Sequence, residues 1–182
     1  MTDEPVYCVA TMGTFILAGT SKGKLELHTI NTDKNQIEQI KKYDTHPDEK
    51  SICYKIVFAD DCFYSITFNP ENQQGQGRLS IFAAQNKFSH LISTDLRGQP
   101  ISICYMPYGE TIVIGYMDGT LEFRNQEGFI KKGDAKRNKS LIREIRRHEN
   151  FFFCLGQYGD SSVWVVFNEE EAQKRKDQYI EQ

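Results

Sequence analysis

The chain has 182 residues, of which 39% are hydrophobic, and a formal net charge of −3. This length is sufficient for one domain with a buried core. The small net charge gives no overall field that would attract nucleic acid or an acidic membrane. No apolar run in the sequence approaches the roughly 18 residues of a transmembrane helix, and its acidic start lacks the basic and apolar regions of a secretory signal.

In chain order, the apolar pattern predicts strands in four successive units, with polar turns between them. The first unit has strands near residues 5–11, 14–20, 24–30 and 36–43, and the second near 51–58, 62–69, 78–84 and 88–94. The third has strands near 100–106, 110–116, 120–125 and 128–132, and the fourth near 141–147, 151–157 and 162–167. Residues 169–182 are strong helix formers and predict a short C-terminal helix in place of the fourth unit's last strand.

An apolar marker recurs at similar positions in the four units. Leu25, Leu79, Leu121 and Val163 each open an alternating strand, with spacings of 54, 42 and 42 residues. The insert at residues 69–76 explains the longer first spacing. The sequence Ser-Ile-Cys-Tyr at 51–54 recurs at 102–105. A period of about 40–45 residues with four short strands in each unit is typical of propeller blades.

Two glycine turns support this reading of the strands. Lys22-Gly23 and Asp118-Gly119 lie between alternating apolar runs, which is a strong hairpin signal because glycine accepts a positive φ. The strand after each turn alternates, with Glu26 between two leucines in the first unit. This period of two predicts that one face of each strand packs into a core.

The segment Gly115–Asn125 resembles the end of a WD repeat, with Phe123 at the Trp position and Asn125 near the Asp. Asp44-Thr-His46 precedes a β run, as the Gly-His pair does in that family. The resemblance covers about residues 5–168 and implies a β-propeller that docks other proteins without catalysing a reaction. It also implies the absence of cofactors.

We therefore expect an all-β fold: a propeller-like array of about four antiparallel four-stranded blades. The blades span about 5–45, 46–96, 97–136 and 137–168 within a domain of residues 1–168, and the helical tail spans 169–182. WD-type propellers usually close with more blades, and an open array leaves edge strands that recruit other chains. Three arrangements stay open: completion by another polypeptide, a segment of a longer protein, or a closed four-bladed ring.

A basic segment lies between the third and fourth units and carries few acidic residues. It is either a solvated linker or a contact surface for an acidic protein or for RNA backbone. Aromatic residues, which would stack on bases, are absent between Ile130 and Asn150. The candidate partner-binding residues are Lys131, Lys132, Lys136, Arg137, Lys139, Arg143, Arg146 and Arg147.

Five cysteines occur singly in apolar β-type runs: Cys8, Cys53, Cys62, Cys104 and Cys154. A thiol nucleophile or a metal site is one interpretation. The settings favour the other, small buried residues in a reducing compartment, and hence the cytoplasm, with the nucleus as an alternative. The four histidines lack metal-ligand spacing, so we predict no metal site.

The sequence contains no motif of an enzyme or of a phosphate-binding loop. We therefore predict a non-catalytic scaffold that binds other protein subunits in a larger assembly. The alternatives are a ribonucleoprotein component that contacts RNA through residues 131–147, and an enzyme with a site in the propeller channel. We expect the single tryptophan, Trp164, to be buried in a run, 162–167, that is covered on both faces.

Overall fold

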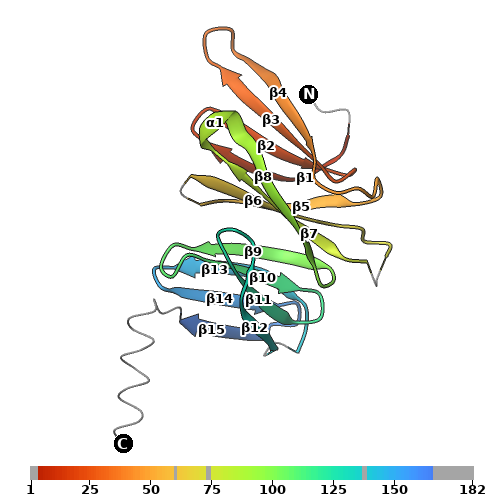
Figure 1. The fold of residues 1–182 in the computed structure, drawn as a ribbon, viewed down its shortest axis with the longest axis vertical. Coiled ribbons are helices and arrows are strands. Elements are labelled where there is room, and N and C mark those ends of the chain that lie inside the picture. Colours follow the sequence, from red (N-terminus) through yellow and green to blue (C-terminus); the bar gives the residue numbers. More distant parts are fainter. Residues whose placement is uncertain (1–3, 60, 73–74, 137–138, 166–182) are drawn as a thin grey trace, which may run out of the picture.

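The computed structural model describes residues 4–59, 61–72, 75–136 and 139–165. Over these residues the chain forms four antiparallel sheets that follow one another along the sequence and stack in a column (Figure 1). We name them sheets A to D. The predicted all-β fold with four sheets is confirmed. The expected C-terminal helix, at 169–182, lies outside the described residues.

Each sheet is a meander in which strands adjacent in sequence are adjacent in space. Sheet A contains β1 (Val6–Met12), β2 (Phe15–Thr20), β3 (Lys24–Asn31) and β4 (Gln36–Asp44). Sheet B contains β5 (Ile52–Ala59), β6 (Cys62–Phe68), β7 (Gly77–Ala83) and β8 (Ser89–Leu96). Sheet C contains β9 (Pro100–Met106), β10 (Thr111–Tyr116), β11 (Thr120–Asn125) and β12 (Ile130–Lys136). Sheet D contains β13 (Ile142–His148), β14 (Phe151–Gly156) and β15 (Ser161–Val165).

One short helix, α1 (Gln85–Phe88), connects β7 to β8. Helix was expected only near the C-terminus, and that expectation was wrong at this connection. Phe88 ends the helical turn with a positive φ of 55°, and its side chain is buried against sheet A. The assignment of residues 1–168 to a single domain, with a separate tail at 169–182, stays a prediction.

The first strand of each sheet lies innermost and packs on the first strand of the next. Strand β1 contacts β5, β5 contacts β9, and β9 contacts β13. Every sheet therefore has an upstream face, toward the preceding sheet, and a downstream face, toward the following sheet. Sheets A and D lie at opposite ends of the column (Figure 1).

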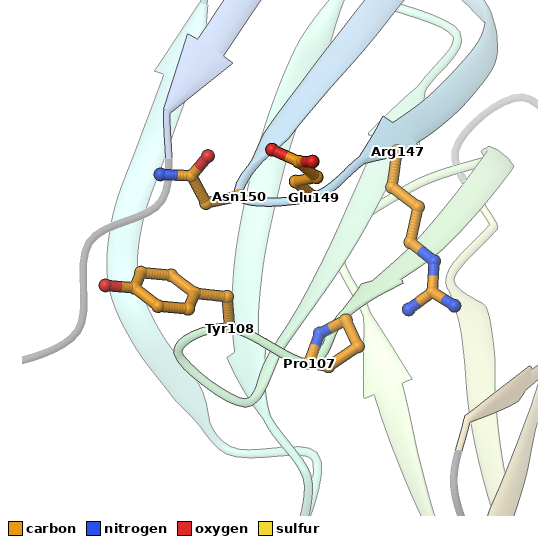
Figure 2. A pocket seen from close by; sticks show the side chains of 5 residues that line it. All are labelled: Pro107, Tyr108, Arg147, Glu149 and Asn150. Atoms are coloured by element: carbon orange, nitrogen blue, oxygen red, sulfur yellow. The ribbon is translucent and has the colours of Figure 1, made fainter.

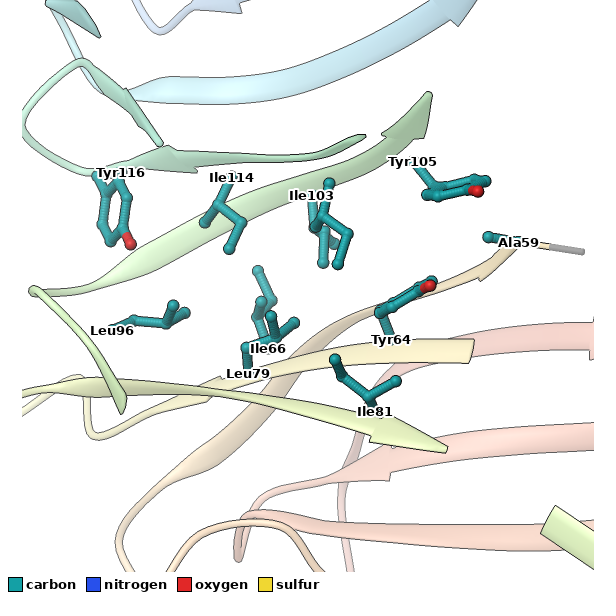
Figure 3. Close-up of a cluster of buried hydrophobic side chains, with 11 residues drawn as sticks. Ala59, Tyr64, Ile66, Leu79, Ile81, Leu96, Ile103, Tyr105, Ile114 and Tyr116 are labelled. Atoms are coloured by element: carbon teal, nitrogen blue, oxygen red, sulfur yellow. The ribbon is translucent and has the colours of Figure 1, made fainter. Parts of the chain in front are cut away.

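The core consists mainly of three joints, each between the downstream face of one sheet and the upstream face of the next. A smaller cluster of Ile52, Phe68 and Ile101, with Leu141 packed against it, lies beside them. At the joint between B and C, Tyr64 and Leu79 of sheet B face Ile103 and Ile114 of sheet C (Figure 3). Alternation along β7 explains how one strand serves two joints. Leu79 and Ile81 pack toward sheet C, while Phe82 packs toward sheet A.

The strand pairing fixes which residues are equivalent between sheets. Leu25, Leu79 and Leu121 are equivalent, because all three are buried and occupy the same place in the third strand of their sheets. Val163 is not their equivalent: it pairs with Phe153 as Phe123 pairs with Val113. That position in sheet D is held by Ser161.

The Ser-Ile-Cys-Tyr recurrence does not mark equivalent positions either. Each innermost strand contains one unpaired bulge residue near its start: Tyr7 in β1, Tyr54 in β5, Ile101 in β9 and Arg143 in β13. The equivalent of Tyr54 is therefore Ile101, four residues before the tyrosine of the second copy of the motif.

Trp164 is half-buried rather than fully buried. Its ring stacks on Phe152 at a centroid distance of 5.9 Å and lies 6.0 Å from the ring of Phe123. The neighbouring Val163 and Val165 are exposed on the other face of the strand. The expectation that this run is covered on both faces was therefore wrong over the described residues, because no described sheet follows sheet D.

Gly19 and Gly115 hold the same position, at which the innermost strand of the next sheet passes closely. A Cβ on Gly19 would lie 2.7 Å from Cys53 Sγ, and one on Gly115 would lie 2.8 Å from Ile142 Cγ2. Because these positions have no free volume, a methyl group would push two sheets apart.

We predict that Gly115→Ala lowers the free energy of unfolding by about 1–3 kcal/mol through overpacking of the joint, measured by urea denaturation. Gly13→Asn is the control, because a Cβ there meets no atom within 4 Å and asparagine tolerates a positive φ. Equal stability of Gly115→Ala and the unaltered chain would contradict the close packing at this joint.

Candidate interaction surfaces

The structure divides the basic segment between two strands at opposite edges of neighbouring sheets. Lys131, Lys132 and Lys136 belong to β12, the outermost strand of sheet C. Arg143, Arg146 and Arg147 belong to β13, the innermost strand of sheet D. Lys139 lies between the two strands, and Arg137 lies outside the described residues. Three strand spacings of about 4.8 Å separate the two edges of a four-stranded sheet, so strands β12 and β13 do not lie side by side.

Several of these cations already have partners within the chain. Lys131 Nζ donates to the Gly109 carbonyl at 2.6 Å, and Arg147 Nη1 donates to the Tyr105 carbonyl at 3.4 Å. Arg146 Nε lies 3.4 Å from a Glu144 carboxylate oxygen, although its side chain is largely exposed. The binding of a partner by these residues stays a prediction.

Arg147 also lines a hollow beside the turns that follow β9 and β13 (Figure 2). The hollow has a volume of about 650 Å³. Its side chains do not converge on a point as they would around a reacting atom: the Arg147 guanidinium and the Tyr108 ring point in different directions (Figure 2). The lining residues are Pro107, Tyr108, Arg147, Glu149 and Asn150.

An ion pair joins sheets B and D across the innermost strand of sheet C. Lys55 Nζ of β5 donates to Glu144 Oε1 of β13 at 2.8 Å, and both side chains are partly buried. Ser102 of β9 adds a second tie by donating from Oγ to the Ile142 carbonyl at 2.9 Å. These contacts hold the innermost strands together. Lys55 and Glu144 therefore have a structural role as an ion pair between sheets.

The histidines make hydrogen bonds that stabilise the sheets and their turns. His28 Nε2 lies 3.3 Å from Glu26 Oε2, and His46 Nδ1 lies 2.8 Å from Ser51 Oγ. Within the described parts of the chain, no three His, Cys, Asp or Glu side chains are close enough together to hold a metal ion. The same parts contain no helix that is long and apolar enough to cross a membrane.

The cysteines are free thiols in the sheets. Cys53, Cys104 and Cys154 are buried, and Cys8 and Cys62 are half-buried. Burial raises the pKa of Cys104 to about 11 and that of Cys154 to about 12. Both thiols are therefore protonated near neutral pH, the state in which a cysteine is a poor nucleophile.

The downstream face of sheet D exposes an apolar patch, which we call the D face. Strand pairing places its members side by side, since Phe151 is opposite Val165 and Phe153 is opposite Val163. Phe153 is 41% exposed, whereas the equivalent residues Leu17, Tyr64 and Val113 are at most 1% exposed. The D face consists of Phe151, Phe153, Leu155, Val163 and Val165.

The upstream face of sheet A, which we call the A face, is open in part. Val9 is 58% exposed, whereas its equivalents Ile56, Ile103 and Ile145 are at most 6% exposed. Val6 is also exposed, while its equivalents in the other three sheets are buried. Ala18, Thr20, Glu26 and His28, on the same face, are buried within the chain. Open strand edges were expected from the sequence, and the structure shows that apolar side chains are also exposed on one face of each end sheet.

Comparison with known proteins finds no matching family model and no matching curated protein. Among solved structures, the chain is similar to the computationally designed Ika4 protein, with a TM-score of 0.69 and 15% identity over 91% of this chain and 94% of that one. The computationally designed Ika8 protein gives a TM-score of 0.68 and 16% identity over 88% of this chain and 46% of that one. The C-terminal WD40 domain of Sif2 gives a TM-score of 0.65 and 13% identity, over 84% of this chain and 42% of that one. The chain thus spans less than half the length of the last two, and these likenesses concern the fold alone.

We predict that Cys104 and Cys154 resist iodoacetamide in the folded chain at pH 8. A pKa of about 11 or 12 leaves only about one thiol in a thousand or fewer ionised at that pH, and the thiolate is the reactive form. Mass spectrometry of the labelled peptides measures this, with labelling in urea as the control. Rapid labelling of either residue in the folded chain would show a reactive thiol instead.

Proposed function

We propose that the chain is a non-catalytic scaffold that binds other proteins as a subunit of a larger assembly. The D face is the observation that carries this proposal. Its five apolar side chains are adjacent on two paired strands and exposed to solvent. Contiguous exposed apolar patches on soluble proteins mark surfaces that bind other proteins or membranes.

The shape and composition of the D face favour a protein partner over a small molecule. Small-molecule sites are concave and enclose most of their ligand, whereas this patch is the outer face of a sheet. At each of the three joints between described sheets, the surface that covers such a face is another sheet. The similarity in fold to the WD40 domain of Sif2 supports the same choice.

A polar rim lies beside the patch and includes one of the predicted basic residues. Arg146 is directly opposite Phe153 in the strand pairing, and His148 is opposite Phe151. An apolar centre with a charged rim is typical of protein interfaces. We therefore propose that Arg146 contacts an acidic group on the partner, and that Lys131 on β12 does not belong to this interface.

The free thiols support a location in a reducing compartment. All five cysteines lack disulfide partners, and such thiols persist in the cytoplasm and the nucleus. We propose the cytoplasm, with the nucleus as the alternative.

We predict that Phe153→Glu removes specific protein partners while the fold remains intact. A glutamate would place an unpaired charge in the centre of the apolar patch, where burial is costly. Because Phe153 is exposed, its replacement should change the stability of the chain by only about 0.5 kcal/mol. Tagged chains are purified from their native source, and the proteins recovered with each variant are identified and quantified by mass spectrometry.

Phe129→Glu is the matched control, because Phe129 is an exposed phenylalanine in the turn between β11 and β12, away from both open faces. Partners that depend on the D face should be lost with Phe153→Glu and retained with Phe129→Glu. Recovery of the same partners in the same amounts with both variants would refute the proposed role of the D face.

A further inference from the structure

We infer that a second copy of this chain covers both open faces, with the D face of each copy docked on the A face of the other. The two copies would then form one ring of eight sheets. This inference rests on the proposed function, that the open faces bind protein, and it names the partner.

The joints inside the chain show which surfaces fit together. In each of the three, the downstream face of one sheet packs on the upstream face of the next. No joint pairs two upstream faces or two downstream faces among the described residues. The D face is a downstream face and the A face is an upstream face, so the two are the halves of one further joint of the same kind.

Two exposed or half-buried residues on the A face match residues that are buried on the upstream face of sheet C. Val9 and Ile16 occupy the places of Ile103 and Ile112, which are fully buried against sheet B. Ile16 is only half-buried. Both positions therefore carry the kind of side chain that is covered by the preceding sheet at the joint between B and C.

A polar pair recurs at equivalent positions in sheets A and C. In sheet C, Arg124 lies 2.5 Å from Glu122 and reaches back to sheet B, donating to Thr94 Oγ1 at 2.9 Å and to the Asp95 carbonyl at 3.1 Å. In sheet A, Glu26 and His28 hold the equivalent positions and lie 3.3 Å apart. There the pair is buried within the chain, and Lys42 Nζ lies 2.9 Å from Glu26 Oε1. The pair therefore marks sheet A as built on the same pattern as sheet C, while Val9 and Ile16 provide the exposed apolar part of its upstream face.

A second copy satisfies both faces at once. Sheets A and D lie at opposite ends of the column (Figure 1), so one copy in this conformation does not cover its own ends. Head-to-tail contacts close into a ring when the rotation permits, and eight is within the usual range of four to eight blades. Once the first joint forms, the second is intramolecular, which strengthens association.

Sedimentation equilibrium of the full chain tests this inference. We expect a discrete species of twice the 21.1 kDa mass of the chain. Val9→Glu and Phe153→Glu should each raise the dimer dissociation constant at least about 30-fold, the effect of losing one central interface residue. Phe129→Glu should leave it unchanged. An equimolar mixture of Val9→Glu and Phe153→Glu should recover dimer, because their heterodimer retains one unaltered joint.

Circular dichroism and urea unfolding of each variant verify that it is folded. If a glutamate variant unfolds, Val9→Thr and Phe153→Thr replace the pair, since threonine is well tolerated in strands. A dimer that survives either glutamate substitution, a mixture that stays monomeric, or polymers that grow with concentration would each overturn the two-copy ring.

A monomeric chain would also overturn it, and the partner recovery experiment then separates the two proposals. If another protein is recovered with the unaltered chain but not with Phe153→Glu, the D face binds that protein and the proposed function stands. If Phe153→Glu recovers the same proteins as the unaltered chain, both proposals fail.

Discussion

A sheet in this molecule has two apolar faces, and each face needs another sheet to cover it. Leu79 and Phe82 illustrate the constraint, since one strand directs the first into the joint with sheet C and the second into the joint with sheet A. Close packing at the joints depends on positions such as Gly115, where Ile142 of the next sheet leaves no room for a side chain. Every sheet is therefore stabilised by its neighbours more than by itself.

This constraint is unmet at the two ends of the array. Val9 and Phe153 are exposed only because no described sheet lies beyond them, while residues at the same positions elsewhere are buried. Lys55 and Glu144 tie the innermost strands of sheets B and D together, so three of the four sheets are held together at their inner strands, and apolar side chains stay exposed on the outer faces of sheets A and D. The function that we propose follows from those faces, because apolar area that remains exposed favours association with another protein.

The sequence predicts the sheets well because their signals are local. The strands are placed correctly by the alternation of apolar and polar residues around Leu25 and Leu121. The turns are placed correctly by the glycines at residues 23 and 119, which have a positive φ. The register of sheet D was missed because Ser161 replaces the buried leucine of the other sheets. Its distance from Gly159, two residues as in sheets A and C, would have revealed the equivalence.

The interaction surfaces depend on spatial order, which no local pattern records. Lys131 and Arg146 are close in sequence but belong to the outer and inner edges of different sheets. Hydroxyl-radical footprinting of the native assembly tests the central claim, that the D face is covered when the protein functions, most directly. We expect Phe151 and Phe153 to be protected in the assembly and oxidised after dilution dissociates it, while Phe129 and Tyr158 are oxidised in both. Equal oxidation of Phe153 and Phe129 in the intact assembly would contradict the account.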